Sequence, residues 1–194
     1  LHASTQMALH TLSGVTEAAA LGMTRAVLAR ELSRADIKTI LDGSPIEIET
    51  FAHGALCMCY SGQCEMSAVI GGRSGNRGAC AQPCRLRYGW HGKADANPLS
   101  LKDMNLASCA ADMADLGVAC LKLEGRMKRP EYVAAVTSIY AALLRERRAP
   151  TADEQKKLAL AFSRDGFTDL YYRGGRGREM FGVRPENARW PEEW

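Results

Sequence analysis

The sequence predicts an α/β fold, and two observations support that prediction. Three short apolar segments, 1–5, 25–29 and 46–50, alternate with helical segments before the first cysteine. A fourth apolar segment, 118–125, precedes the most strongly periodic helix of the chain. This alternation is typical of a parallel sheet or barrel. Four strands are half of an eight-stranded (β/α) barrel, which takes about 250 residues, and the alternative is an open sheet.

Recognisable signals bound the helices that alternate with these strands. Gly22 is a typical helix terminator, Ser33 is a plausible N-cap, and Pro130 suits a first helical turn. The predicted helices cover residues 15–23, 34–41, 99–116, 129–148 and 152–161. The fourth of them has one apolar face, and arginines near its C-terminal end suit the helix dipole. That face consists of Tyr132, Val136, Ile139, Tyr140 and Leu143.

A cysteine-rich loop, predicted over residues 52–98, follows the third strand. The segment 49–85 holds five of the seven cysteines among several glycines, so its backbone is expected to be neither helix nor strand. Residues 88–97 are expected to be irregular as well. A long loop inside a compact domain is uncommon unless something functional holds it.

Four of these cysteines, Cys57, Cys64, Cys80 and Cys84, could supply soft thiolate ligands to one metal centre. Zinc sites usually use paired C-x2-4-C spacings, and only the last pair approaches that pattern. The uneven spacing on a glycine-rich loop fits an iron–sulfur cluster better. Zinc, and buried or reactive thiols, remain the alternatives. Cys59 is expected to point elsewhere, as a small apolar side chain.

Composition and charge narrow the classes of partner. The chain has 46% hydrophobic residues and a net charge of +3, which is ordinary for a globular protein. Between residues 61 and 93, five basic residues stand against one acidic residue, and this excess would attract an RNA backbone. No apolar run approaches the length of a membrane span, and no signal peptide is visible. The clustered, odd number of cysteines favours metal binding in a reducing compartment, so we expect a cytoplasmic protein.

Polar side chains follow the ends of the predicted strands, where parallel α/β folds collect their functional groups. These side chains are Gln6, Arg30, Glu31, His53, Glu124 and Arg126. Glu31, His53 and Glu124 are therefore candidates for proton transfer. Simpler interpretations stay open, because Arg30 and Glu31 could pair with neighbours and His53 could be a hydrogen-bonded loop histidine.

The sequence pattern of the chain changes near residue 149. Residues 1–148 are predicted to form the α/β part, including the cysteine-rich loop, and residues 149–194 the start of a small appended domain. The glycine–arginine segment 173–178 in this second part could contact phosphate, but a flexible arginine loop is the favoured interpretation.

Two motifs in the cysteine-rich loop resemble a known family. Residues 49–67 read E-x-F-x-x-G-A-L-C-x4-G-x-C-x-M-S, and residues 73–85 read R-S-G-N-R-G-x-C-x-Q-P-C-R. Both are similar to the pattern of the collagenase-like peptidase family U32. The resemblance extends to segments on either side of the loop, which are residues 2–7, 28–33, 99–104 and 121–133.

The resemblance implies a TIM-like barrel of which this chain holds the second half, followed by a small C-terminal domain. Better understood bacterial members of the family look like hydroxylation enzymes with a [4Fe–4S] cluster. They act on RNA bases, with prephenate as the implied co-substrate, or on a quinone precursor as a heterodimer. The resemblance implies that Cys57, Cys64, Cys80 and Cys84 hold the cluster. Some relatives have a cysteine where this chain has Asn105, which leaves the fourth ligand open.

Three functions can be weighed against these residues. A hydroxylase could use Gln6, Arg30, Arg73 and Arg126 to hold RNA or a prephenate-like dicarboxylate by charged hydrogen bonds. A peptidase needs an activated nucleophile or a metal-bound water, and none of the four histidines makes an HExxH motif. A metal-bearing scaffold that only binds a partner is the third possibility. Unpaired edges of half a barrel would favour a homo- or hetero-oligomer.

Overall fold

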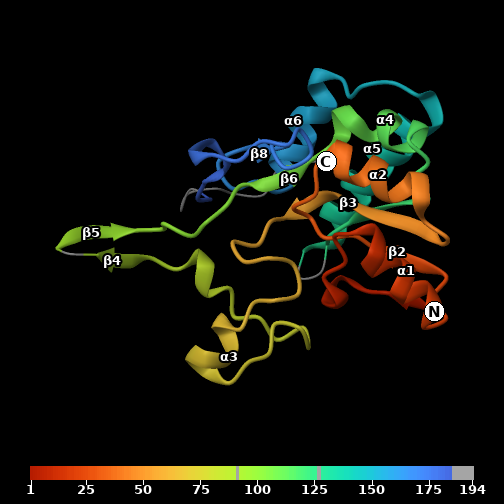
Figure 1. Ribbon diagram of the computed structural model, residues 1–194. Helices are drawn as coiled ribbons and strands as arrows, with labels where there is room; N and C mark the ends of the chain where they lie inside the picture. Colours follow the sequence, from red (N-terminus) through yellow and green to blue (C-terminus); the bar gives the residue numbers. More distant parts are fainter. Residues whose placement is uncertain (91, 126–127, 185–194) are drawn as a thin grey trace.

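The computed structural model describes residues 1–90, 92–125 and 128–184, and its centre is a six-stranded sheet (Figure 1). Along the sheet the order is β1-β2-β3-β6-β8, and β7 also pairs with β3. These described strands form an open sheet. The strands are β1 (His2–Ala3), β2 (Arg25–Val27), β3 (Glu47–Ala55), β6 (Asp103–Asn105), β7 (Cys120–Leu123) and β8 (Phe167–Thr168). The α/β class predicted from the sequence is confirmed.

Strand β3 is the axis of this sheet. It pairs in parallel with β2 on one side and with β7 on the other, and its last residues pair antiparallel with β6. Seven consecutive residues of β3, 48–54, are buried. A strand buried on both faces is expected when helices or other segments cover both sides of a sheet. The predicted strand 46–50 is therefore five residues longer at its C-terminal end, and His53 lies within it and not on a loop.

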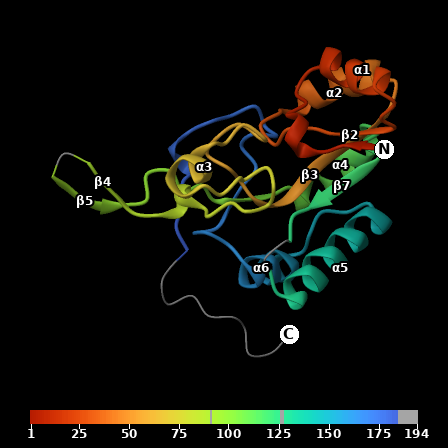
Figure 2. The same cartoon turned by 90° about the horizontal axis from the view of Figure 1, so that it is seen from below.

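Helices surround the sheet in two groups (Figure 2). Helix α1 (Leu12–Ala20) packs beside α2 (Arg34–Gly43), and α5 (Pro130–Glu146) packs beside α6 (Ala152–Ala161) and α4 (Ala110–Asp115). Capping boxes begin α2 and α6, where Ser33 pairs with Asp36 and Thr151 pairs with Glu154. The apolar face predicted for the long helix is buried along α5.

Two predictions between residues 88 and 116 are wrong. The expected helix 99–116 is instead strand β6, a short 3-10 helix (Ala107–Cys109) and α4. Pairing with β3 and burial of Asp103 and Met104 outweigh the helical propensity of this segment. The expected irregular stretch 88–97 forms a hairpin of β4 (Tyr88–Trp90) and β5 (Lys93–Ala96) that extends away from the sheet (Figures 1 and 2).

The cysteine-rich loop begins only after β3 and contains elements of its own. Helix α3 (Met66–Gly71) and a 3-10 turn (Pro83–Arg85) interrupt it. Figure 1 shows α3 and the β4–β5 hairpin on one side of the molecule, apart from the helices that cover the sheet. The loop is thus a lobe attached to one edge of the sheet.

Residues after 149 join the same sheet. Strand β8 pairs in parallel with β6, and Leu101 forms an isolated bridge with Phe181. A 3-10 turn (Arg178–Met180) follows the glycine–arginine segment. The division of the chain into domains near residue 149 stays a prediction, but residues 167–181 pack against the α/β part.

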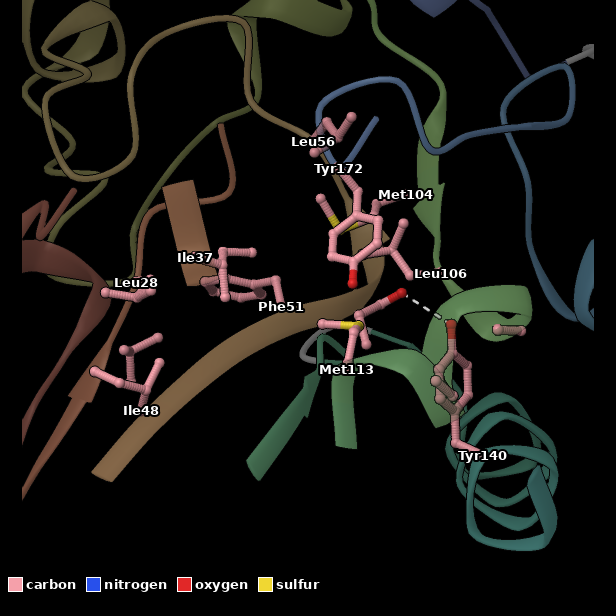
Figure 3. Packing of buried hydrophobic residues seen from close by; sticks show 14 of the residues in the cluster. Leu28, Ile37, Ile48, Phe51, Leu56, Met104, Leu106, Met113, Tyr140 and Tyr172 are labelled. Carbon is pink, nitrogen blue, oxygen red and sulfur yellow. Dashed lines mark hydrogen bonds between the residues drawn. The ribbon is translucent and has the colours of Figure 1, made fainter. Parts of the chain in front are cut away.

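A continuous hydrophobic core lies between β3 and the helices (Figure 3). Ile48 and Phe51 of β3 are buried in it together with Met113 of α4 and Tyr140 of α5. The Tyr140 hydroxyl donates a hydrogen bond of 2.8 Å to the carbonyl of Ala52. This bond satisfies the buried phenol and attaches α5 to the central strand. Nowhere in the described residues is a helix both long and apolar enough to cross a membrane.

A substitution at Gly54 tests how closely β3 must approach Glu124, the residue after β7. It has φ of +124°, and a Cβ there would lie 2.8 Å from Glu124 Cβ and 2.9 Å from the Glu124 carbonyl oxygen. We expect Gly54→Ala to lower the free energy of unfolding by about 3 kcal/mol or more, because strain and a backbone clash add. The matched control is Gly117→Ala, where φ is +96° but a Cβ would meet nothing within 4 Å.

The control should lose only about 1–2 kcal/mol, since strain alone acts there. Urea unfolding followed by circular dichroism measures both variants. Equal losses in the two variants would contradict the close approach of β3 and β7.

Candidate functional site

The C-terminal ends of β2, β3 and β7 meet at one edge of the sheet, and the cysteine-rich loop leaves from that edge. Arg30 follows β2, Glu124 follows β7, and the loop begins after β3. Because β3 pairs in parallel with both neighbours, these ends are brought together. The Arg30 guanidinium and the Glu124 carboxylate form an ion pair across 94 residues of sequence.

Arg30 has three protein partners. Its guanidinium carbon lies 3.7 Å from the centroid of the Phe51 ring, its Nη2 pairs with Glu124, and its Nη1 lies 3.3 Å from Ser61 Oγ. The Arg30 side chain is only 9% exposed. A buried arginine of this kind needs both a counter-charge and hydrogen-bond acceptors. Here the protein supplies them for Nη1 and Nη2, whereas Nε is buried without a hydrogen-bond partner among the described residues. The expectation that Arg30 could pair with a neighbour is thus met, whereas its role in holding a substrate stays a prediction.

Ser61 attaches the cysteine-rich loop to this edge. Its backbone N–H and its hydroxyl donate to Glu31 Oε1 over 2.9 Å and 3.1 Å, and its Oγ also accepts from the backbone N–H of Arg30. Ser61 is 2% exposed and lies between Cys59 and Cys64. Sequence reasoning missed it, because a serine among glycines carries no distinguishing signal. Glu31 Oε2 is buried and has no hydrogen-bond partner among the described residues.

Gln6 makes a second attachment. Gln6 Nε2 donates to the carbonyl of Asn76 over 3.3 Å, and Asn76 Nδ2 donates to the carbonyl of Gly62 over 2.9 Å. Gly62 has φ of +78°, and a Cβ on it would lie 2.9 Å from the carbonyl oxygen of Thr5. Only glycine fits such a close approach in this conformation. Gln6 therefore joins two distant parts of the loop to the end of β1.

Two arginines of the loop serve its own structure. Arg85 Nη1 donates to the Leu101 carbonyl over 2.7 Å and to Ser100 Oγ over 3.2 Å, and its Nη2 donates to the Leu56 carbonyl. Arg73 Nε donates to the Ala79 carbonyl over 2.9 Å. Arg73, predicted to hold a substrate, is exposed and bonded within the loop, and its substrate role stays a prediction. Arg126, the remaining predicted anion-binding residue, lies outside the described residues.

All seven cysteines, each of which the structure describes, are free thiols. The charge of Cys84 contributes to raising the pKa of Cys57, and the Cys59 thiol is within hydrogen-bonding reach of Cys64. Cys59 thus lies near Cys64, and its assignment as a small apolar side chain that takes no part in a metal centre stays a prediction. Cys80 Sγ accepts from the backbone N–H of Gln82 over 3.2 Å.

The chemistry of these donors suits a thiolate-bound metal. Burial of the thiol raises the pKa of Cys57, although the residue as a whole is exposed. Burial likewise raises the pKa of Cys59. A bound cation would oppose both shifts by stabilising the thiolates. Within the described part of the chain, however, no three His, Cys, Asp or Glu side chains are gathered closely enough to hold a metal ion. Asn105, at the position where some relatives have a cysteine, donates to Gln155 Oε1 over 2.9 Å.

His53 lies beneath this edge and is 1% exposed. Its Nδ1 is 3.3 Å from the Tyr140 hydroxyl, and its ring centroid is 5.3 Å from that of Phe167. His53 Nε2 is buried without a hydrogen-bond partner among the described residues. Burial lowers the pKa of His53 to about 4, so the imidazole is neutral near pH 7. The role in proton transfer predicted from the sequence stays a prediction, and the structure shows that the ring is isolated from solvent.

Two hollows open beside α2. The smaller, about 300 Å³, is lined by Glu31, Asp36, Tyr171 and Arg176 and lies next to the attachment of the loop. The larger, about 730 Å³, is lined among others by Arg34, Asp112 and Tyr172, which are hydrogen-bonded to one another. The glycine–arginine segment 173–178 contributes to both hollows, so it is packed against α2 and is not detached from the body.

The pKa of His53 predicts how stability depends on pH. The folded value, about 4, is below the unfolded value of 6.5, so the unfolded chain binds more protons in this window. Stability should be complete above pH 6.5 and decline as the pH falls toward 4, with a loss of about 2 kcal/mol between pH 7 and pH 5. Urea unfolding of the wild type and of His53→Gln at both pH values measures this.

The His53→Gln variant is expected to be less stable at pH 7 but to lose about 2 kcal/mol less than the wild type on going to pH 5. Carboxylates that also titrate in this range contribute equally to both proteins and cancel in the comparison. Parallel pH profiles would show that His53 is not held neutral by burial.

Ser61 predicts the local stability of the cysteine-rich loop. In Ser61→Ala, Glu31 loses a donor and Arg30 loses an acceptor at a buried position. We expect backbone amides around Cys64 to exchange hydrogen about tenfold faster or more, which corresponds to roughly 1.4 kcal/mol of local opening. Hydrogen exchange followed by mass spectrometry measures this.

Ser74→Ala is the matched control in the same loop, because Ser74 accepts two loop hydrogen bonds through its carbonyl. Its exchange should match that of the wild type. If both variants left exchange around Cys64 unchanged, Ser61 would not be the attachment that we describe.

Comparison with known proteins agrees with the loop motifs. The chain is 38% identical over 156 residues to the tRNA hydroxylation protein P1 of Bacillus subtilis (strain 168), covering 74% of this chain and 37% of that protein. It is 41% identical over 150 residues to the 23S rRNA 5-hydroxycytidine C2501 synthase of Escherichia coli (strain K12), covering 74% and 23%. It is 38% identical over 175 residues to a collagenase of Porphyromonas gingivalis (strain ATCC BAA-308 / W83), covering 77% and 42%.

The chain thus spans less than half the length of each of these relatives. No solved structure matches it. The pattern of peptidase family U32 matches residues 1–181, which include the sheet, both motifs of the cysteine-rich loop and the strand-end attachments. On this evidence the chain belongs to peptidase family U32.

Proposed function

We propose that this chain is the part of an RNA-base hydroxylation enzyme that holds a thiolate-bound metal centre against the end of an α/β sheet. The observation that carries the proposal is the attachment of the five-cysteine loop, through Ser61, to Arg30 and Glu31 at the ends of parallel strands. Two relatives with nearly two fifths identity are named for hydroxylation of tRNA and rRNA. The substrate, and the activity of the whole protein, belong to this proposal.

The centre we propose is a [4Fe–4S] cluster held by Cys57, Cys64, Cys80 and Cys84, with zinc as the alternative. When bound, such a cluster supplies one-electron redox chemistry whose potential depends on nearby charge and solvent. Cys59 lies beside Cys64 and is a further candidate for the fourth position, since Asn105 is bonded to Gln155. Loading of the cluster would require the loop to draw these thiols together.

The chain's own residues would orient the reaction. Arg30 and Ser61 hold the loop, and Glu31 has one buried carboxylate oxygen free among the described residues beside the 300 Å³ hollow. Glu31 and Glu124 are the candidates to hold a proton, and the positive charge of residues 61–93 would attract RNA in a salt-dependent way. A dicarboxylate of the prephenate type is the proposed co-substrate.

The remaining proposals concern the complete fold, the cellular compartment and the oligomeric state of this enzyme. The parallel pairing of β1, β2, β3 and β7 is compatible with the second half of a (β/α) barrel, completed by chain that is present in the longer relatives. The free thiols are compatible with a reducing cytoplasm. Open strand edges would favour pairing with another copy or another subunit.

A peptidase is the second candidate, because one relative is named a collagenase. A thiol peptidase needs a histidine that can accept the proton of its nucleophile. His53 is buried, and its ring packs on Tyr132, Tyr140 and Phe167. Among the described residues, His53 Nδ1 lies near the Tyr140 hydroxyl and Nε2 has no hydrogen-bond partner, so neither nitrogen is bonded to a thiol, which favours the hydroxylase.

Metal analysis separates these candidates. Purified without oxygen, the full-length protein should contain about four iron and four sulfide per chain, with a charge-transfer absorption in the visible range. Cys80→Ala should lose most of the iron and abolish the hydroxylated nucleoside, which mass spectrometry of digested RNA measures in cells that depend on the variant gene. Cys120→Ala, in β7 and outside the loop, should retain both.

Colourless, iron-free protein that cleaves gelatin would reverse the assignment in favour of the peptidase. Iron-loaded protein whose loss leaves every hydroxylated nucleoside unchanged would retain the metal centre and remove the RNA substrate.

A further inference from the structure

The buried His53 is contacted by polar groups from two other elements. Tyr140 points from α5 toward the central strand (Figure 3), and its hydroxyl lies 3.3 Å from His53 Nδ1. Asn105 is the partner of His53 in the pairing of β3 with β6, and its side chain is within hydrogen-bonding reach of the imidazole. These two contacts determine which ring nitrogen carries the hydrogen.

Tyr140 Oη has one hydrogen and three neighbours. The Ala52 carbonyl oxygen lies at 2.8 Å, whereas Asn105 Oδ1 and His53 Nδ1 both lie at 3.3 Å. The hydroxyl therefore donates to the Ala52 carbonyl, which makes the shortest contact and can only accept. Since that hydrogen is used, the hydrogen between Tyr140 Oη and His53 Nδ1 has to come from the imidazole.

The side-chain amide of Asn105 has a defined orientation. The backbone N–H of Ala107 donates to Asn105 Oδ1 over 2.9 Å, and only the amide oxygen can accept this bond. On the other side, Nδ2 donates to Gln155 Oε1 over 2.9 Å. Asn105 thus presents an acceptor beside the Tyr140 hydroxyl. Burial lowers the pKa of His53, and the hydrogen bond with Asn105 partly opposes this, as expected if the imidazole is the donor.

The imidazole is therefore neutral, with its hydrogen on Nδ1 and a lone pair on Nε2. The rings of Tyr132, Tyr140 and Phe167 pack around it at centroid distances of 6.2, 5.6 and 5.3 Å. Burial lowers the pKa of His53 to about 4, and the positive charge of Lys128 lowers it as well. Near pH 7, Nε2 can accept a hydrogen bond but does not keep a proton.

We propose that Tyr140 and Asn105 are positioning residues that fix His53 as the neutral Nδ1–H tautomer, so that Nε2 accepts a hydrogen bond from an N–H or O–H group at the reaction centre. This inference deepens the proposed function, on which the link to the reaction rests, whereas the tautomer does not depend on that function. His53 then orients the group that it binds, and proton transfer is left to Glu31 or Glu124. An acceptor enclosed by aromatic rings is strong because water does not compete for it.

The tautomer is measured on the full-length protein labelled with ¹⁵N-histidine. Long-range ¹H–¹⁵N correlation spectra distinguish a protonated ring nitrogen from an unprotonated one. The resonances that are missing from the spectrum of His53→Gln belong to His53. At pH 7 we expect a protonated Nδ1 and an unprotonated Nε2.

Loss of either acceptor should weaken the preference for this tautomer. Tyr140→Phe removes the hydroxyl, while the Ala52 carbonyl keeps its bond from the Leu106 N–H. Tyr140→Phe and Asn105→Ala should each lower the ratio of the Nδ1–H to the Nε2–H tautomer about fivefold, as the loss of one hydrogen bond predicts. The double variant should lower the ratio further than either single variant.

Tyr132→Phe is the matched control. Tyr132 also lies on α5 and packs against the His53 ring, but its hydroxyl donates to the Glu124 carbonyl over 3.2 Å. This variant should keep the tautomer ratio of the wild type. Circular dichroism checks that each variant is folded, and Tyr140→Phe tests the proposal even if Asn105→Ala fails to fold.

Two substitutions of His53 separate a hydrogen-bond acceptor from a base. His53→Gln offers an amide oxygen that can accept a hydrogen bond but cannot take up a proton, whereas His53→Leu offers neither. We expect His53→Gln to form the hydroxylated nucleoside at one tenth of the wild-type rate or faster, and His53→Leu to be slowed about 100-fold or more. Mass spectrometry of digested RNA after induction of each variant gene measures the rates.

An unprotonated Nδ1 in the wild type would overturn the positioning role, as would unchanged tautomer ratios in both Tyr140→Phe and Asn105→Ala. Equal rates in His53→Gln and His53→Leu would overturn the acceptor role of Nε2. A fixed Nδ1–H tautomer in a protein whose loss leaves every hydroxylated nucleoside unchanged would support the positioning role while removing the proposed function.

Discussion

The position of the cysteine-rich loop depends on one buried group of charges, Arg30 with Glu124 and with Ser61. The Arg30 side chain is only 9% exposed, so its charge needs a counter-charge and acceptors inside the protein, and Glu124 and Ser61 supply them for Nη2 and Nη1. Glu124 comes from β7, Arg30 from the end of β2, and Ser61 from the loop itself. The parallel sheet thus holds the loop through electrostatics at strand ends, because little of the loop packs into the core.

The lobe formed by the cysteine-rich loop exposes several apolar side chains. Val69 and Ile70 of α3 are 83% and 64% exposed, and Tyr60 is 70% exposed. A six-residue helix with such side chains gains little from burial, and the hydrogen bond from the Ala81 N–H to Ser67 Oγ helps to hold it in the lobe. A loop held in this way can rearrange around an inorganic centre at smaller cost than a packed core could.

Ion pairs lie on both sides of this edge. On one side Arg30 pairs with Glu124, while on the other Arg164 pairs with the buried Asp103. In a family whose members are named both for hydroxylation and for proteolysis, the charges at this edge give a physical basis for asking what the site binds.

The sequence by itself determined the α/β class, the helices α2, α5 and α6, and the family, because capping residues, apolar periodicity and glycine–cysteine spacing are local signals. It did not determine β6 or the β4–β5 hairpin, since Asp103 and Met104 become a strand only through pairing with β3. Nor could it reveal Ser61, which is an ordinary residue in its own segment. Tertiary structure decided β6 and the role of Ser61, because the energies that select them arise between residues 30 to 94 positions apart and leave no local pattern. The β4–β5 hairpin is a local pairing, Tyr88 with Ala96, in a segment without a strong strand pattern.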